Sequence, residues 1–372
     1  MAERKSAVEG VGMNLEFFKG KSVLVTGHTG FKGAWLCRIL KFAGARVFGY
    51  ALEPVDGGIF ESVSAADNMS SNIGDIRDLK RLNKIFETAQ PEIVFHLAAQ
   101  PIVLESYASP AYTFETNVMG TVNLLECVRQ SKTARSVVIV TTDKVYKNNE
   151  WTYGYREIDM LGGNDPYAAS KAGAEIVSDC YRTSFLHNVP LSTARAGNVI
   201  GGGDISVNRI IPDCVRAAIR NEEIIVRNPY SVRPYQHVLE PLFAYLLIAA
   251  RQYKNPELAG NYNIGPDESD CVNTGKITDI FCEAWGNGLT WKSVSTANAP
   301  HESNLLRLDC SKMRSVFKWS PVWNVEKAVE KTVEWEKTRY ADGDVCACLD
   351  NQIGEYLEVF QFGGVSINER IT

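Results

Sequence analysis

Short apolar runs alternate with longer amphipathic segments through much of the chain. The apolar runs are bounded by turn residues and predict buried strands at 21–26, 45–50, 92–97, 136–141 and 190–194. The amphipathic segments predict helices at 34–40, 111–130 and 166–186. Strands that alternate with helices form parallel sheets covered on both faces, so the pattern predicts an α/β fold with a doubly wound parallel sheet.

The alternation weakens after residue 200, where loops rich in Gly, Asn and Arg begin. A helix ending near 251 and a strand at 260–265 then return to the earlier pattern. We therefore expect a nucleotide-binding domain made of 13–195 and 235–265. A smaller, discontinuous substrate-binding lobe is expected from 196–234 and 266–340. The leader at 1–12 and the tail at 341–372 receive no role.

Composition excludes several classes of protein. The 372 residues are 45% hydrophobic and 22% charged, with a net charge of -5, which argues against a nucleic-acid or membrane-surface partner. No run is long enough to span a membrane, and 1–12 lacks the apolar core of a signal peptide. The nine cysteines include no Cys-x-x-Cys pair, which favours reduced thiols in a cytoplasmic protein with no metal site.

A glycine-rich turn follows the first predicted strand and precedes the first predicted helix. It reads Gly27-His28-Thr29-Gly30-Phe31-Lys32-Gly33. Glycine lets the backbone approach a pyrophosphate, and the following helix N-terminus favours its negative charge. In this context the turn predicts a Rossmann-type dinucleotide site. Glu53, where an acid can bind ribose hydroxyls and repel a 2′-phosphate, favours NAD as the cofactor.

Further cofactor contacts are predicted where later strands end. A carboxylate at Asp75, after a further predicted strand that ends near residue 73, can accept from the adenine amino group. Small residues after the strand at 92–97 let the backbone lie against a flat ring. The predicted residues are Asp75, Ile76, Leu97, Ala98, Ala99, Gln100 and Asn117, together with Tyr167 and Lys171.

Tyr167 and Lys171 lie four residues apart on a predicted helix, so both side chains share one face. A nearby ammonium stabilises a phenolate, so we expect Lys171 to lower the pKa of Tyr167 and make it a usable base. Thr142, at the end of a predicted strand, can bind the same substrate hydroxyl. These three residues predict oxidation of an alcohol.

Asp143 and Lys144 add a carboxyl and an amine beside this set. A plain dehydrogenase does not need them, whereas elimination of water next to an oxidised carbon needs an acid and a base. The competing interpretation is an ion pair at a strand end.

Long stretches of the chain resemble the extended short-chain dehydrogenase/reductase family, and within it the CDP-glucose 4,6-dehydratases. The resemblance covers about 19–337; related dehydratases for other nucleotides usually carry glutamate where this chain has Lys144. The matching stretches are 25–33, 91–101, 116–121, 165–167, 195–204 and 233–241.

The resemblance implies oxidation of CDP-glucose at C4 by bound NAD, elimination of water across C5 and C6, and return of the hydride to C6. Tyr167 would be the first base, Lys144 would remove the C5 proton, and Asp143 would protonate the departing hydroxyl. The product would be a CDP-4-keto-6-deoxy sugar for deoxysugar biosynthesis. The predicted substrate contacts are Asn198, Arg209, Arg227, Arg233 and His237.

Alternatives remain open at this stage. A 4-epimerase or reductase would leave Asp143 and Lys144 without a task, a UDP-sugar 4,6-dehydratase would use them, and an NAD-sensing protein would not need Tyr167. The helices at 111–130 and 166–186 have apolar faces beyond what one sheet covers, which predicts a homodimer or homotetramer.

Overall fold

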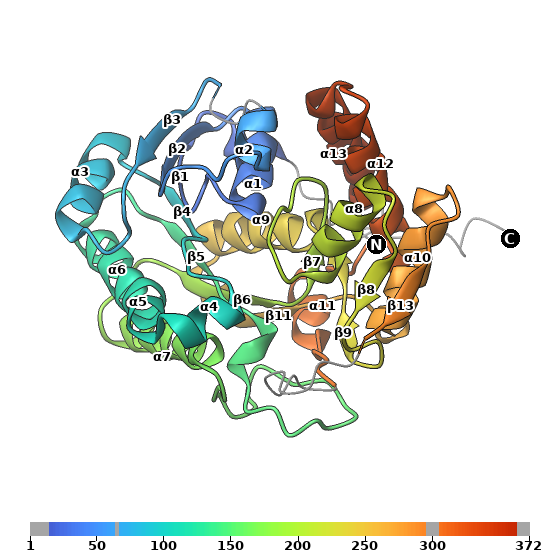
Figure 1. Cartoon of the computed structure of the whole chain (residues 1–372). Helices are drawn as coiled ribbons and strands as arrows, with labels where there is room; N and C mark the ends of the chain where they lie inside the picture. Colours follow the sequence, from blue (N-terminus) through green and yellow to red (C-terminus); the bar gives the residue numbers. More distant parts are fainter. Residues whose placement is uncertain (1–14, 64–66, 295–304, 363–372) are drawn as a thin grey trace, which may run out of the picture.

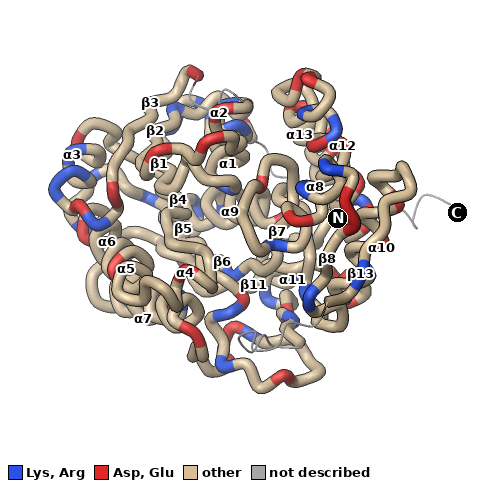
Figure 2. The backbone as a smooth tube through the Cα atoms, in the orientation of Figure 1, with Lys and Arg blue, Asp and Glu red and all other residues tan. Residues whose placement is uncertain are grey.

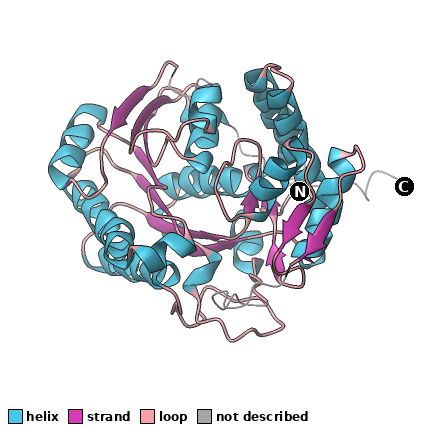
Figure 3. Ribbon diagram, viewed as in Figure 1, coloured by secondary structure: helices cyan, strands magenta, loops and turns pink. Residues whose placement is uncertain are grey.

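The computed structural model describes residues 15–63, 67–294 and 305–362. The predicted leader at 1–12 lies outside these residues. A parallel sheet of seven strands forms the centre, in the order β11-β6-β5-β4-β1-β2-β3, which confirms the α/β prediction (Figures 1 and 3). The strands are β1 (Ser22–Thr26), β2 (Arg46–Ala51), β3 (Ser70–Ile73), β4 (Ile93–His96), β5 (Ser136–Val140), β6 (Leu191–Ala196) and β11 (Asn261–Ile264).

Strand order reverses at β1, which pairs with β2 on one side and with β4 on the other. Thr26, the last residue of β1, lies opposite Tyr50 in β2 and His96 in β4. The carboxyl ends of these strands therefore open onto one crevice, where ligands of doubly wound sheets bind. β1, β4 and β5 contain no charged residue, and charges gather on the outer helices (Figure 2).

Helices cover both faces of the sheet (Figure 3). On one face α1 (Phe31–Phe42) and α9 (Leu239–Lys254) enclose the larger apolar core, which includes Trp35 and Phe243. On the other face the core includes Leu82 and Leu124. The helices of that face are α3 (Leu79–Ala89), α6 (Gly120–Gln130) and α7 (Pro166–Ser184).

The helix predicted at 111–130 is one helical run with a change of winding inside it. It consists of α5 (Pro110–Phe114), a π-helical segment η2 (Glu115–Met119) and α6. Single π turns inside helices occur often at functional sites, because they shift one side chain out of the regular register. Here the segment contains Asn117, a predicted site residue.

The second lobe is built from short paired strands and helices around its own apolar core. Its strand pairs are β7 (Val199–Ile200) with β10 (Gln236–His237), β8 (Ile224–Val226) with β13 (Trp291–Ser293), and β9 (Val232–Pro234) with β12 (Cys271–Asn273). Its helices are α8 (Ile210–Ile219), α10 (Thr274–Trp285) and α12 (Val325–Tyr340). Helix α11 (Ser311–Phe317) instead lies beside β11 and packs Met313 and Phe317 into the larger core. The remaining short elements are η1 (Leu15–Phe18), α2 (Ile59–Ser62), α4 (Val103–Ala108), η3 (Asp143–Val145), η4 (Pro256–Leu258) and η5 (Glu268–Asp270).

The tail, to which no element was assigned from the sequence, contains the long helix α13 (Val345–Phe362). Asp350 pairs with Arg38 of α1 at 2.6 Å, and the Tyr356 hydroxyl donates to the buried Glu240 of α9 at 2.7 Å. The tail up to Phe362 is therefore part of the folded body and packs against α1 and α9 (Figure 1). None of the helices in the described ranges is long and apolar enough to cross a bilayer.

Candidate active site

The glycine turn packs against the end of β4 through its backbone. Gly27 has a φ of +74°, and a Cβ on it would lie 2.7 Å from the Ala98 amide nitrogen. A Cβ on Gly33 would collide with the Gly27 carbonyl. Gly30, at the N-cap of α1, meets only the Gly27 carbonyl at 3.4 Å and has no side chain with which to cap the helix. The first-turn amides of α1 are thus left for an anion, which fits a cofactor pyrophosphate.

Two predicted turn residues use their side chains within the protein. His28 is fully buried, lies 2.8 Å from the Ser71 hydroxyl and meets the Phe60 ring edge-on. Burial lowers the pKa of His28 to about 4, so the ring is neutral near pH 7. The Thr29 hydroxyl donates to the Leu52 carbonyl at 2.9 Å. For these residues the backbone is the part that remains for a cofactor.

Asp75 is held by Arg77, which the sequence analysis did not anticipate. The carboxylate accepts from the Arg77 backbone amide at 2.9 Å and from its guanidinium at 2.7 Å. Hydrogen bonds from Arg77 lower the pKa of Asp75. Ile76 is buried beneath Gly120 of α6. The pair leaves Asp75 partly exposed, and the predicted adenine contact would have to share its oxygens with Arg77.

Gln100 and Asn117 connect the loop after β4 to helix α7. The Asn117 amide accepts from the Gln100 amide nitrogen at 2.8 Å and donates to the Gln100 carbonyl and to the Ser170 hydroxyl. Both side chains are buried, whereas Leu97, Ala98 and Ala99 are partly exposed. The three small or apolar residues could lie against a ring, and Asn117 acts by positioning the loop.

Thr142, Asp143 and Lys144 leave the carboxyl end of β5 together. The Thr142 hydroxyl donates to Asp143 Oδ1 at 2.9 Å, and Lys144 Nζ lies 3.4 Å from the same oxygen. Asp143 is fully buried, and its Oδ2 has no hydrogen-bond partner among the described residues. The Lys144 side chain is 33% exposed. An acid and an amine thus stand side by side, with one carboxyl oxygen left for a ligand.

Tyr167 and Lys171 face the same strand end from α7, as predicted. The expected lowering of the tyrosine pKa was wrong for this structure: burial raises the pKa of Tyr167 to about 12 and outweighs its hydrogen bond with Thr142. Lys171 Nζ donates to the Val140 carbonyl at 3.1 Å. Burial lowers the pKa of Lys171 to about 8, against the opposing charge of Glu175. Loss of hydration therefore dominates both groups.

Lys32 and Arg209 complete a cluster of charges that separate motifs did not reveal. Burial, together with the charges of Arg209 and Lys171, lowers the pKa of Lys32 to about 7 against the opposing charges of Asp143 and Asp204. Arg209 pairs with Asp204 at 3.0 Å and remains 38% exposed. Its charge also favours the Tyr167 phenolate. Lys32, Arg209 and Lys171 thus place three basic side chains near the carboxyl end of β5, which suits an anionic ligand.

Gly197 is a site residue that was missed. A Cβ on it would collide with Asp143 Oδ2, so only glycine allows the carboxyl to occupy its buried position. The next residue, Asn198, has a φ of +33°, and its Oδ1 is buried without a partner in the described part of the chain. The pair Gly197-Asn198 was visible in the sequence, but only the fold brings it against the end of β5.

The other predicted substrate residues are spread over different environments. Arg233 is buried on β9, where its guanidinium donates to the Val232 carbonyl at 2.9 Å, and Arg227 is exposed beside Asn208. His237 is fully buried between Trp35 and Trp323. Burial lowers the pKa of His237 to about 3. The expectation of a substrate contact at His237 is therefore corrected: the ring is a packed core residue.

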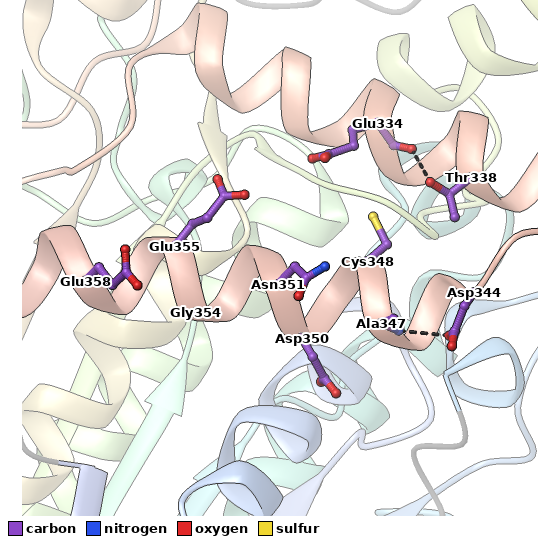
Figure 4. Close-up of a pocket in the computed structure, with 10 residues that line it drawn as sticks. All are labelled: Glu334, Thr338, Asp344, Ala347, Cys348, Asp350, Asn351, Gly354, Glu355 and Glu358. Atoms are coloured by element: carbon purple, nitrogen blue, oxygen red, sulfur yellow. Dashed lines mark hydrogen bonds between the residues drawn. The ribbon is translucent and has the colours of Figure 1, made fainter.

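A surface cavity of about 590 Å³ lies between α12 and α13, away from all of these residues (Figure 4). Five carboxylates line it, which disfavours an anionic nucleotide. They belong to Glu334, Asp344, Asp350, Glu355 and Glu358. The cavity is therefore not the candidate active site.

Comparison with known proteins places the site in a family. The chain is 45% identical to CDP-glucose 4,6-dehydratase of Salmonella typhimurium over 350 residues, 92% of this chain and 97% of that protein. The structure of dTDP-glucose 4,6-dehydratase from Bacillus anthracis in complex with NAD aligns with a TM-score of 0.74 at 22% identity, covering 87% of this chain and 99% of that one. UDP-glucose 4-epimerase from Thermus thermophilus in complex with NAD aligns with a TM-score of 0.75 at 25% identity, covering 85% and 98%.

The family model for GDP-mannose 4,6 dehydratase matches residues 24–332, which include the glycine turn, the end of β5 and the catalytic helix. The resemblance inferred from the sequence motifs is thereby confirmed. This chain belongs to the GDP-mannose 4,6 dehydratase family.

Proposed function

We propose that this protein is an NAD-dependent CDP-glucose 4,6-dehydratase that converts CDP-glucose to CDP-4-keto-6-deoxyglucose. The observation that carries the proposal is the buried Asp143 carboxyl with Lys144 Nζ at 3.4 Å, directly beside Thr142 and Tyr167. Oxidation alone would use only Thr142, Tyr167 and Lys171. The 45% identity to the Salmonella enzyme supports the choice of nucleotide.

The glycine turn and the loop after β4 would hold NAD. Gly30 and the first turn of α1 would face its pyrophosphate, and Leu97, Ala98 and Ala99 would line the rings. Asp75 would accept from the adenine amino group beside Arg77. When bound, NAD would take a hydride from C4 and return it to C6, and its positively charged ring would favour the Tyr167 phenolate.

The chain's own groups would handle the protons. Tyr167, oriented by Thr142 and supported by the Lys171 ammonium, would remove the proton of the 4-hydroxyl. The resulting ketone acidifies C5, and Lys144 as free amine would take the C5 proton. Asp143 in its protonated form would donate to the 6-hydroxyl as it leaves, so that water departs. As the hydride returns to C6, Lys144 would return its proton to C5. The proton taken by Tyr167 would pass through Thr142 to Asp143, so both groups would be restored and the reaction would involve no net oxidation.

The second lobe would bind the nucleotide. Arg209 and Arg233 offer forked donors to the diphosphate, and Asn198 has a buried oxygen that could accept from the substrate. The exposed Arg227 would lie toward the base. In this assignment the domain boundaries expected from the sequence, with 196–234 and 266–340 as the substrate lobe, remain part of the proposal.

The assembly in the cytoplasm would be a homodimer or homotetramer. Large apolar side chains are exposed along α5 to α7, on the face away from the sheet. They include Phe114, Met119, Ile176 and Phe185. Antiparallel packing of two such helix pairs would form a four-helix bundle and cover them.

The test is an assay of purified protein with NAD and CDP-glucose that follows the alkali-induced ultraviolet absorbance of a 4-keto-6-deoxy sugar. UDP-glucose, dTDP-glucose and UDP-N-acetylglucosamine run in parallel. We expect product from CDP-glucose and a loss of about 10³-fold for Tyr167→Phe. Turnover of another nucleotide alone would contradict the substrate assignment. A 4-epimer without any keto sugar would overturn the dehydratase assignment.

A further inference from the structure

A buried polar network lies directly behind the catalytic residues, between α7, β5 and β6. At its centre is Glu175, which is fully buried and lies one helical turn after Lys171 on the same face of α7. Its Oε2 accepts from Arg195 at 2.8 Å and from Thr193 at 2.7 Å. Its Oε1 accepts from the Thr141 hydroxyl. The carboxylate is thus hydrogen-bonded through both oxygens and paired with a buried cation.

Stability alone does not account for this ion pair. Removing two charges from water costs about as much as their attraction in the interior returns, so an apolar pair of the same size often serves the fold equally well. Both Glu175 and Arg195 are almost completely buried, at 0% and 1% side-chain exposure. The location of the charge therefore calls for another explanation.

We propose that Glu175 is a positioning residue whose negative charge keeps the Lys171 ammonium protonated beside Tyr167. This inference rests on the proposed function, in which Lys171 supports the base. Thr141 binds the Glu175 carboxylate, and its neighbour Thr142 binds Asp143 and Tyr167, so the network is joined to the catalytic strand end. Arg195 pairs with the Glu175 carboxylate through Nη2, and its Nη1 is held by hydrogen bonds to the Tyr146 hydroxyl and the Glu157 carbonyl.

The other groups around Lys171 make this charge necessary. Burial lowers the pKa of Lys171 to about 8, and the negative charge of Glu175 keeps that pKa from falling further. Lys32, at the start of α1, is a second cation near Lys171. His96, at the end of β4, carries no charge near pH 7 because burial lowers its pKa to about 3. Tyr167 carries no charge near pH 7 in the free protein, because burial raises its pKa to about 12, and it must become a phenolate before it can act as the base.

The expected pH dependence of kcat follows from the charges around Lys171. Activity requires the charged form of Lys171, so it falls as the pH rises through the Lys171 pKa. Replacing Glu175 by a neutral group lowers that pKa, and the alkaline limb of kcat moves to lower pH by about one unit. A residue that served only to hold the fold would lower kcat equally at all pH values.

The experiment compares kcat of the NAD-saturated enzyme between pH 6 and 10 for wild type, Glu175→Gln and Thr193→Val. Glutamine keeps the shape of the side chain and removes its charge. Thr193→Val removes the hydroxyl that bonds to Glu175 and to Asn261 in the same network, and it keeps the Glu175 charge. We expect the alkaline limb to shift in Glu175→Gln and to stay in place in Thr193→Val. If Glu175→Gln does not fold, Glu175→Gln with Arg195→Met removes both charges and takes its place.

A second measurement does not depend on turnover. The pKa of Lys171 is read from the pH titration of lysine labelled with ¹³C at Cε, assigned with Lys171→Arg. A lower pKa in Glu175→Gln supports the inference, and an unchanged pKa overturns it. If wild type forms no keto sugar, the proposed function fails while this titration still decides the inference. If wild type is active, Tyr167→Phe is inactive and the profiles of wild type and Glu175→Gln coincide, only the inference fails.

Discussion

The glycine turn and the second lobe, which we propose to bind the substrate, contribute to the site by different means. At the turn, the backbone is the part available to bind a cofactor. Gly27 and Gly33 have no room for a Cβ. The side chains of His28 and Thr29 form hydrogen bonds within the protein. In the lobe, long side chains from separate elements must converge. A backbone site depends on glycine at fixed positions, whereas a side-chain site depends on where the fold carries each residue.

The largest effect is expected at the turn. In Gly33→Ala the new Cβ collides with the Gly27 carbonyl, so the turn must open and the affinity for NAD should fall by about 10²-fold or more. NAD binding by isothermal calorimetry measures this, with thermal unfolding as a check of the fold. Gly354→Ala in α13 is the matched control, because its Cβ meets no atom within 4 Å. Normal NAD binding by the Gly33 variant would show that the turn does not depend on glycine at this position.

At the end of β5, Gly197→Ala should impair catalysis without impairing cofactor binding. The Cβ would displace the Asp143 carboxyl, and a misplacement of about 1 Å at a reacting group costs about 10²-fold in rate. We expect kcat to fall by that factor and NAD affinity to stay unchanged, because the residue lies outside the turn. A variant with wild-type kcat would show that the position of Asp143 is not critical.

Within the lobe, two arginines should differ in their effects. Arg209 lies near Lys32 and Tyr167, so Arg209→Ala should raise the KM for CDP-glucose by about 10-fold or more, the cost of a lost charged hydrogen bond. Arg227 is exposed, and Arg227→Ala should change KM less, by about threefold at most. Steady-state kinetics with CDP-glucose distinguishes them. Equal increases in KM would mean that the exposure of an arginine does not predict whether it binds CDP-glucose.

The smallest kinetic effect is expected for His237→Asn, which keeps an acceptor for the Leu239 amide. KM should stay within about threefold, because the wild-type ring is packed between tryptophans and does not face the site. The ring has a folded pKa of about 3 against 6.5 when unfolded, so its contribution to stability is present above pH 6.5 and is lost as the pH falls. Thermal unfolding of the variant should therefore decline less between pH 7 and pH 5 than that of wild type. A large increase in KM would restore His237 as a substrate contact.

Local patterns predicted most of the sheet and three of the helical segments around it, at 34–40, 111–130 and 166–186, but not every element near it. The strands at 21–26, 92–97 and 136–141 were found because buried parallel strands are apolar along their whole length. The π-helical turn at Glu115–Met119 was not predicted, because its register is set by the contacts of Asn117 with Gln100 and Ser170. Helix α13 was missed, since its assignment depends on packing against Arg38 and Glu240.

The sequence by itself determined the parts of this protein that depend on neighbouring residues. These are the alternating strands and helices, the glycine turn, the Tyr167 and Lys171 pair on one helix face, and the adjacent Asp143 and Lys144. Only the tertiary structure decided which charges meet. It buried Tyr167 and raised its pKa, and it brought Gly197 against Asp143 and Arg195 against Glu175. The physical reason is that burial and the distances between charges set electrostatic energies, and both are fixed by contacts between residues far apart in the chain.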